Sequence, residues 1–139
     1  MGYSFDASTE RAAGSVSTID FFELCPELTF KSQLAATAGP FTLLDIVIAP
    51  EGGVDTAIAA WRETTRFMRQ RAGLLRADLY RGSAGSNVLI NLAVWESAAA
   101  LLEAVENPEF AEVTGGYPPG CTCTRQAIAP VAVAGICVS

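Results

Sequence analysis

The sequence predicts an α+β fold of the ferredoxin-like type, in which a four-stranded antiparallel sheet carries helices on one face. Three observations lead to this prediction. Apolar residues alternate in four separate segments, as they do in strands that have two distinct faces. Two other segments repeat their apolar residues every three or four positions, as amphipathic helices do. The resulting order of strand, helix, strand, strand, helix, strand is the split βαβ arrangement.

The first predicted strand covers residues 41–49 and carries one charge, Asp45, among apolar side chains. The turn-forming residues 50–53 end it. A helix follows, and its apolar stripe consists of Val54, Ile58, Trp61, Thr65 and Met68. Its polar side carries Arg62, Arg66 and Arg69. We interpret that side as a solvated face rather than as an anion site.

The second and third predicted strands form a hairpin. Residues 74–81 alternate between two faces, residues 82–86 are rich in Gly and Ser, and residues 88–96 alternate again. Ser97 can cap the second helix, and a further helical turn begins at Asn107, which Pro108 follows.

The fourth predicted strand covers residues 121–128, and residues 131–138 extend it or pair elsewhere. The first forty residues differ from the domain of residues 41–139. We expect a mobile tail over residues 1–17, then an apolar segment, residues 19–36, that packs on the domain and forms a short helix after Pro26.

Composition excludes several functions. The net charge of −6 opposes binding to nucleic acid, and no apolar run is long enough to span a membrane. The N-terminus lacks the layout of a secretory signal, so we expect a cytoplasmic protein. The chain contains no histidine, which removes Ser-His and Cys-His nucleophile systems and histidine-ligated iron or haem.

The four cysteines do not predict a metal site. Cys121 and Cys123 are separated by one residue, whereas zinc ligands are usually separated by two to four. Cys25 and Cys137 lie near the two ends of the chain. We interpret the paired cysteines as small buried apolar residues.

Asn91 and Trp95 are the most informative residues, because they interrupt an apolar strand at even spacing. Both side chains project from one face with Ala93 between them, roughly 13 Å apart along the strand. The other face carries Val88, Ile90, Leu92 and Val94. We expect that other face to pack against the helices, and the Asn91 face to form the wall of an apolar cavity with a few hydrogen-bonding groups.

A four-residue hairpin loop over residues 83–86 places Asp78 opposite Asn91. The same pairing brings Arg76 opposite Ala93, and Tyr80 diagonal to Asn91. Asp45 points to this side from the first strand. The remaining predicted wall residues are Leu43, Val47 and Leu89.

The predicted cavity face needs a cover, because it carries Leu43, Val47, Tyr80, Leu89 and Trp95. Two such sheets facing each other in a two-fold homodimer would provide one, with C-terminal residues crossing to the partner. We therefore expect a dimeric α/β barrel with a cavity in each subunit.

Residues from about 41 to 133 resemble the antibiotic biosynthesis monooxygenases. The resemblance rests on the strand order, on Trp95 to Ser97 leading into an Ala-rich helix, on Asn107 to Phe110 after it, and on Asn91 four residues before Trp95. Tyr80 matches a tyrosine of anthrone-oxidising members. Leu101 and Arg81 stand where some members carry a second tyrosine and a histidine.

The resemblance implies a dimeric α+β barrel that oxidises polyketide anthrones or quinols with O2, without a metal or organic cofactor. Asn91 and Trp95 would donate hydrogen bonds to the substrate oxygen that gains negative charge, as in an oxyanion hole. Tyr80 would orient the phenol edge of an aromatic polyketide-like substrate.

Asp78 and Asp45 are the candidate bases, because burial raises the pKa of a carboxyl group and makes it a stronger base. Arg76 beside Asp78 would have the opposite effect. Structural roles stay open for the same residues. Asp45 could pair with Arg76 or Arg125, Asp78 could satisfy Asn91, and Trp95 could be a core aromatic.

Three functions remain open. The leading hypothesis is a cofactor-independent oxygenase of aromatic polyketide metabolism. The second is a cyclase or isomerase on the same scaffold, which would consume no oxygen. The third is a module that binds an aromatic metabolite without converting it.

Overall fold

The computed structural model describes residues 19–138, and it contains five strands and four helices in that range. In chain order the elements are β1 (Ile19–Phe22), α1 (Phe30–Ala36), β2 (Phe41–Ile48), α2 (Val54–Arg69), β3 (Leu74–Arg81), β4 (Val88–Trp95), α3 (Ala98–Glu106), α4 (Pro108–Thr114) and β5 (Cys121–Ile128). The predicted tail over residues 1–17 lies outside the described residues. No helix in the described range is long and apolar enough to cross a membrane.

The five strands form one open mixed sheet in the order β1-β5-β2-β4-β3. The β2–β5, β2–β4 and β3–β4 pairs are antiparallel, as the ferredoxin-like prediction requires. The prediction of four strands was wrong, because β1 pairs in parallel with the first half of β5. In β1, Ile19 and Phe21 are buried and alternate with Asp20, so this short segment has an apolar face that the sheet edge can bury.

Helix α1 lies beside the second half of β5. Thr29 caps its N-terminus by accepting a hydrogen bond from the Ser32 backbone N–H. The Gln33 side chain accepts from the Ala127 backbone N–H at 2.9 Å, and it also donates to the Gln126 side chain. The β1–β5 pairing ends at Thr124, and Gln33 provides the acceptor for the Ala127 backbone N–H beyond that point.

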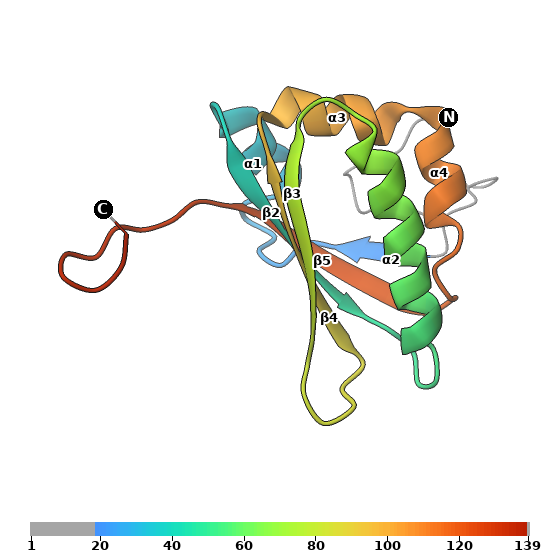
Figure 1. The fold of residues 1–139 in the computed structure, drawn as a ribbon. Coiled ribbons are helices and arrows are strands. Elements are labelled where there is room, and N and C mark those ends of the chain that lie inside the picture. Colours follow the sequence, from blue (N-terminus) through green and yellow to red (C-terminus); the bar gives the residue numbers. More distant parts are fainter. Residues whose placement is uncertain (1–18, 139) are drawn as a thin grey trace.

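Helices α2, α3 and α4 lie on one side of the sheet (Figure 1). The β4 residues that face them are Leu89, Asn91, Ala93 and Trp95, which are all buried. The prediction that the opposite set, Val88 to Val94, packs against the helices was therefore wrong. Both faces of β4 are rich in apolar residues, so alternation alone does not say which face the helices cover.

The β3–β4 hairpin is paired one residue differently from the prediction. Leu79 lies opposite Asn91, and Asp78 lies opposite Leu92. Because neighbouring residues of a strand point to opposite faces, this change turns Arg76, Asp78 and Tyr80 away from Asn91.

The loop length explains the difference. The Gly82 backbone N–H donates to the Val88 carbonyl oxygen at 2.9 Å, so the loop spans residues 83–87 rather than 83–86. An irregularity between Leu74 and Arg76 then brings Leu74 opposite Trp95. A β-bulge of this kind re-aims one end of a strand without changing the other end.

Gly73 lets the chain turn from α2 into β3 beneath α3. Its φ is +116°, and a Cβ placed there would lie 2.4 Å from the Ala100 Cβ. Its carbonyl oxygen also accepts a hydrogen bond from the Glu96 backbone N–H at 2.8 Å. The end of β4 and the start of α3 therefore depend on glycine at this position.

Gly73→Ala is expected to lower the free energy of unfolding by about 3 kcal/mol, because it adds a steric clash to an unfavourable backbone conformation. Gly85→Ala is the matched control, since its φ is +74° and nothing lies within 4 Å of the added Cβ. It should cost about 1 kcal/mol. Urea unfolding measures both, and an equal loss in the two variants would contradict the predicted clash.

Candidate active site

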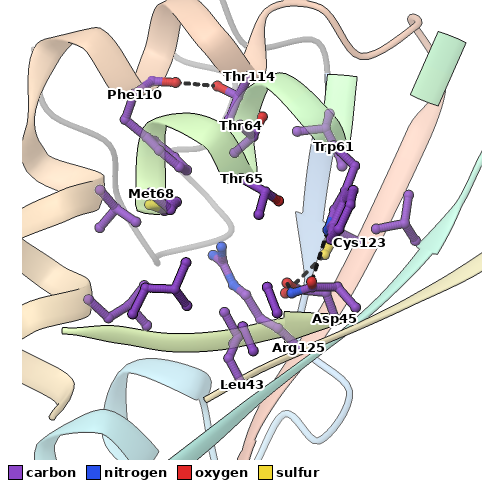
Figure 2. Close-up of a pocket in the computed structure, with 18 of the residues that line it drawn as sticks. Leu43, Asp45, Trp61, Thr64, Thr65, Met68, Phe110, Thr114, Cys123 and Arg125 are labelled. Carbon is purple, nitrogen blue, oxygen red and sulfur yellow. Dashed lines mark hydrogen bonds between the residues drawn. The ribbon is translucent and has the colours of Figure 1, made fainter. Parts of the chain in front are cut away.

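A cavity of about 100 Å3 lies between the sheet and helices α2, α3 and α4 (Figure 2). Its walls are mainly apolar side chains from both layers. The residues that carry polar groups at its walls are Asp45, Trp61, Thr64, Thr65, Asn91, Trp95, Thr114, Tyr117, Cys123 and Arg125. An apolar hollow with a few converging polar groups is the usual form of a small-molecule site.

Three polar side chains form a chain of hydrogen bonds at the sheet side of the cavity. The Trp61 Nε1–H donates to Asn91 Oδ1 at 2.9 Å. The Asn91 Nδ2–H donates to Asp45 Oδ2 at 2.9 Å. An indole N–H can only donate, so Trp61 determines the orientation of the amide and directs its NH2 group toward Asp45.

Strand pairing brings Asp45 and Asn91 together, because the two residues lie directly opposite each other on β2 and β4. Trp61 reaches them from α2, and Figure 2 shows its ring next to Asp45 and Cys123. The Cys123 thiol donates to the other carboxylate oxygen, Asp45 Oδ1, at 3.6 Å.

The surroundings of Asp45 raise its pKa above the ordinary value of 3.8. Although the residue as a whole is only half-buried, loss of solvation is the largest effect on its carboxyl group. The positive charge of Arg125 and the hydrogen bonds from Asn91 and Cys123 act in the opposite direction and do not cancel it. A carboxylate in this state is a stronger base than one in water.

Arg125 lies opposite Asp45 on β5 and is 6% exposed. Its guanidinium lies 3.8 Å from the centre of the Phe21 ring and 5.1 Å from the centre of the Phe30 ring. Stacking on aromatic faces stabilises a cation that has left water. Residues 19–36 thus help to hold a positive charge beside the cavity.

Tyr117 lies on the loop after α4, and burial raises the pKa of its hydroxyl group above the ordinary value. The negative charge of Asp45 adds to this effect, while a hydrogen bond with Thr64 opposes it. Tyr117 is therefore a neutral phenol at physiological pH, and it can donate or accept a hydrogen bond.

Trp95 lines the cavity and is 1% exposed. Its Nε1–H has no hydrogen-bond partner among the described residues. A buried donor without an acceptor costs free energy, and a ligand oxygen that reached it would recover that cost.

The structure brings some of the predicted site residues together and separates others. Those that line the cavity are Asn91, Trp95, Asp45, Leu43, Val47 and Ala93. Leu89 is buried in a neighbouring part of the core. Tyr80, Asp78 and Arg76 lie on the opposite face of the sheet, because the hairpin is paired one residue differently. Arg76 and Asp78 form an exposed ion pair there at 2.7 Å.

Sequence reasoning missed Trp61, Tyr117 and Cys123 as parts of the site. The helical spacing of Trp61 predicts a core residue. Trp61 is also next to Arg62 at the edge of the apolar stripe, and from there its indole N–H reaches Asn91 on the sheet. Tyr117 is on a loop, and nothing in its local pattern signals its position. No cluster of three or more potential metal ligands occurs in the part of the chain that the structure describes.

The open sheet, the helix layer and the cavity define a ferredoxin-like α+β domain with a site beneath its helices. Residues 47–114 match the family of antibiotic biosynthesis monooxygenases. This match confirms the resemblance drawn from the sequence. The family match supports a monooxygenase-type activity.

Several solved structures share this fold. SnoaB, a cofactor-independent oxygenase from Streptomyces nogalater, is 19% identical and superposes with a TM-score of 0.63 over 70% of this chain and 99% of its own. A protein from Shewanella loihica PV-4 is 24% identical, with a TM-score of 0.59 over 70% of this chain and 100% of its own.

Rv0793 from Mycobacterium tuberculosis is 17% identical, with a TM-score of 0.56 over 69% of this chain and 99% of its own. At these identities the likenesses establish the common fold. A sequence comparison with curated proteins found no match.

Proposed function

We propose that this protein is an oxygenase that oxidises an electron-rich phenol, quinol or anthrone toward a quinone with O2, the substrate itself supplying the electrons. The observation that carries the proposal is the Asp45 carboxyl group, which borders an apolar cavity, has a raised pKa and is held by Asn91. The family match and the fold shared with SnoaB support the same class of reaction.

Proton removal is the first step in this proposal. Asp45 accepts the proton of the acidic substrate O–H or C–H, which leaves the negative charge on the substrate. Arg125 balances that charge as it balanced the charge of Asp45 before the transfer. The total charge beside the cavity is therefore unchanged. This keeps the free-energy cost of the proton transfer low in a medium of low dielectric constant.

Oxygen then reacts with the substrate anion. The anion gives one electron to O2, and the resulting radical pair combines to form a peroxide. Loss of water from the peroxide converts a CH2 group of an anthrone to C=O, so one O2 is consumed and one H2O is released for each substrate molecule.

Asn91 and Trp95 are the proposed hydrogen-bond donors to the charged substrate oxygen. Asn91 uses one N–H for Asp45, and its amide has a second N–H. Trp95 has the unpartnered indole N–H described above. Donors that are already in place stabilise developing negative charge without reorganisation.

Asp45→Asn should reduce oxygen uptake about a hundred-fold or more, because the amide cannot accept the proton. In the wild type the rate should fall as the pH drops through the raised pKa of Asp45, since only the ionised carboxylate acts as a base. A Clark electrode with a panel of anthrones and naphthols measures both effects.

The control is Asp55→Asn, which makes the same change at an exposed position in the first turn of α2. It should retain the wild-type rate and pH profile. Equal uptake by wild type and Asp45→Asn would remove Asp45 from the mechanism. Substrate conversion without oxygen uptake would instead identify a cyclase or isomerase.

We also infer that two copies of the chain pair through the sheet face that no helix covers. That face carries a band of apolar residues on the central strands, Leu44, Ile46, Ile48, Val88, Ile90, Leu92 and Val94, which are half-buried or exposed. A band of this kind on a soluble domain favours an interface. We therefore still propose the homodimer expected from the sequence. The pairing face is the one that carries Ile90, whereas the sequence predicted the face that carries Asn91.

The C-terminal segment adds a second argument for pairing. Residues 129–138 contain no charged residue, and they extend away from the body of the domain (Figure 1). Their exposed apolar side chains include Val131, Val133, Ile136 and Val138. A second copy of the chain would cover both this segment and the open sheet face.

Ile90→Asp should convert a dimer to a monomer, because a charge in the centre of the band would lose its water on pairing. Light scattering after size exclusion gives the mass, and circular dichroism verifies that the variant is folded. Leu24→Asp changes an exposed residue outside the sheet, and it should leave the dimer intact. A monomeric wild type would contradict the inference.

A further inference from the structure

A second hollow, of about 420 Å3, lies between the outer side of α2 and strand β3. It is lined by four arginines, Arg62, Arg66 and Arg69 of α2 and Arg76 of β3, together with Trp61, Thr65, Leu74, Leu75 and Ala77. We call this hollow the arginine groove. The sequence suggested only a solvated helix face here. Arg76 belongs to the edge strand β3 and borders the hollow, although its side chain projects from the sheet face away from the helices.

The charge of the groove differs from that of the whole protein. The chain has nine Lys and Arg residues and a net charge of −6, yet four of those nine residues line this one groove. The nearby carboxylates are Glu63, which pairs with Arg62 and Arg66, and Asp78, which pairs with Arg76. Arg76 and Asp78 neutralise each other on the far face of the sheet, so three helical arginines against Glu63 leave two positive charges.

Arg69 contributes one of the excess positive charges, because it forms no ion pair with any described residue. Arg66 shares Glu63 with Arg62, at 3.1 and 3.5 Å. The guanidinium groups of these two residues therefore keep donors free for another anion, since each carries five N–H groups.

The arginine groove adjoins the cavity. Trp61 and Thr65 of α2, and Leu74 and Ala77 of β3, line both hollows. Figure 2 shows Trp61 and Thr65 on the helix that roofs the cavity. A ligand whose ring contacts the cavity side of this shared wall could therefore place a substituent among the arginines.

We propose that the arginine groove binds an acidic oxygen substituent, a carboxylate or a phosphate ester, on the aromatic substrate whose ring enters the cavity. This inference rests on the proposed function for the aromatic part of the ligand. The cavity alone is smaller than the roughly 300–1,000 Å3 of typical ligand sites, and the groove supplies additional volume. Arginine suits this task because its fork of N–H groups matches carboxylate and phosphate oxygens.

The exposure of the arginine side chains limits how much the groove can add to the binding affinity. The side chains of Arg62, Arg66 and Arg76 are 61%, 66% and 72% exposed. Interactions of exposed charges are weak one by one and are screened by salt. The groove should thus add specificity and a salt-dependent gain in affinity to the binding that the apolar cavity provides.

The test compares binding of three unreactive probes, 2-naphthoate, its uncharged methyl ester and 2-naphthyl phosphate, by isothermal titration calorimetry. Wild-type protein should bind at least one of the two anions more tightly than the ester. Arg66→Gln with Arg69→Gln should raise the Kd of that anion about five-fold or more, and change the Kd of the ester less than two-fold. Lys31→Gln, on α1, should change neither. High salt should weaken binding of the anion only.

Tighter binding of 2-naphthoate identifies a carboxylate, and tighter binding of the phosphate identifies a phosphate ester. Equal Kd values for ester and anions, or no effect of the double substitution, would overturn the proposal. The probes undergo no oxidation, so the result is independent of turnover. Anion-selective binding in a protein that consumes no oxygen would contradict the oxygenase proposal alone.

Discussion

The contact between Asp45 and Asn91 is the interaction on which the rest of the site depends. The two residues are opposite each other on neighbouring strands, so a change of register by one residue would turn one of them to the other face of the sheet and break the contact. Trp61 adds a hydrogen bond from α2 and links the sheet to the helix layer. The carboxylate is thus held by Asn91 of β4, which Trp61 orients, and by Cys123 of β5, and a base that must meet a substrate requires such a fixed orientation.

The second requirement of the site is a balance of charge in a region with little water. Loss of solvation raises the pKa of Asp45, and Arg125 limits the rise. Arg125 in turn stacks on Phe21 and Phe30. These rings belong to β1 and α1, elements that the ferredoxin-like core does not need. The N-terminal segment therefore takes part in the electrostatics of the cavity as well as in the sheet.

Sequence periodicity predicted the order of the strands and helices from residue 41 onward, because buried faces impose their spacing on the sequence. It did not reveal β1, since four residues are too few to show a reliable alternation. It also assigned the wrong face of β4 to the helices, because Val88 to Val94 and Leu89 to Trp95 are both apolar enough to be buried.

The site was predictable where a polar residue interrupts an apolar strand, as at Asp45 and Asn91. The site was not predictable where the position of a side chain depends on the length of a loop. The fifth loop residue in the β3–β4 hairpin moved Asp78 and Tyr80 to the opposite face. Contacts between elements, such as Trp61 with Asn91, depend on packing that no local pattern encodes.

The most direct test of this account is the pKa of the Asp45 carboxyl group, measured by carbon-detected NMR titration of aspartate-labelled protein and assigned with Asp45→Asn. We expect a pKa above the ordinary value of 3.8, and a further rise in Asn91→Ala, because that change removes a hydrogen bond that favours the ionised form. A pKa at or below 3.8 would show that Asp45 is a structural partner of Arg125, and it would contradict the assignment of Asp45 as the base.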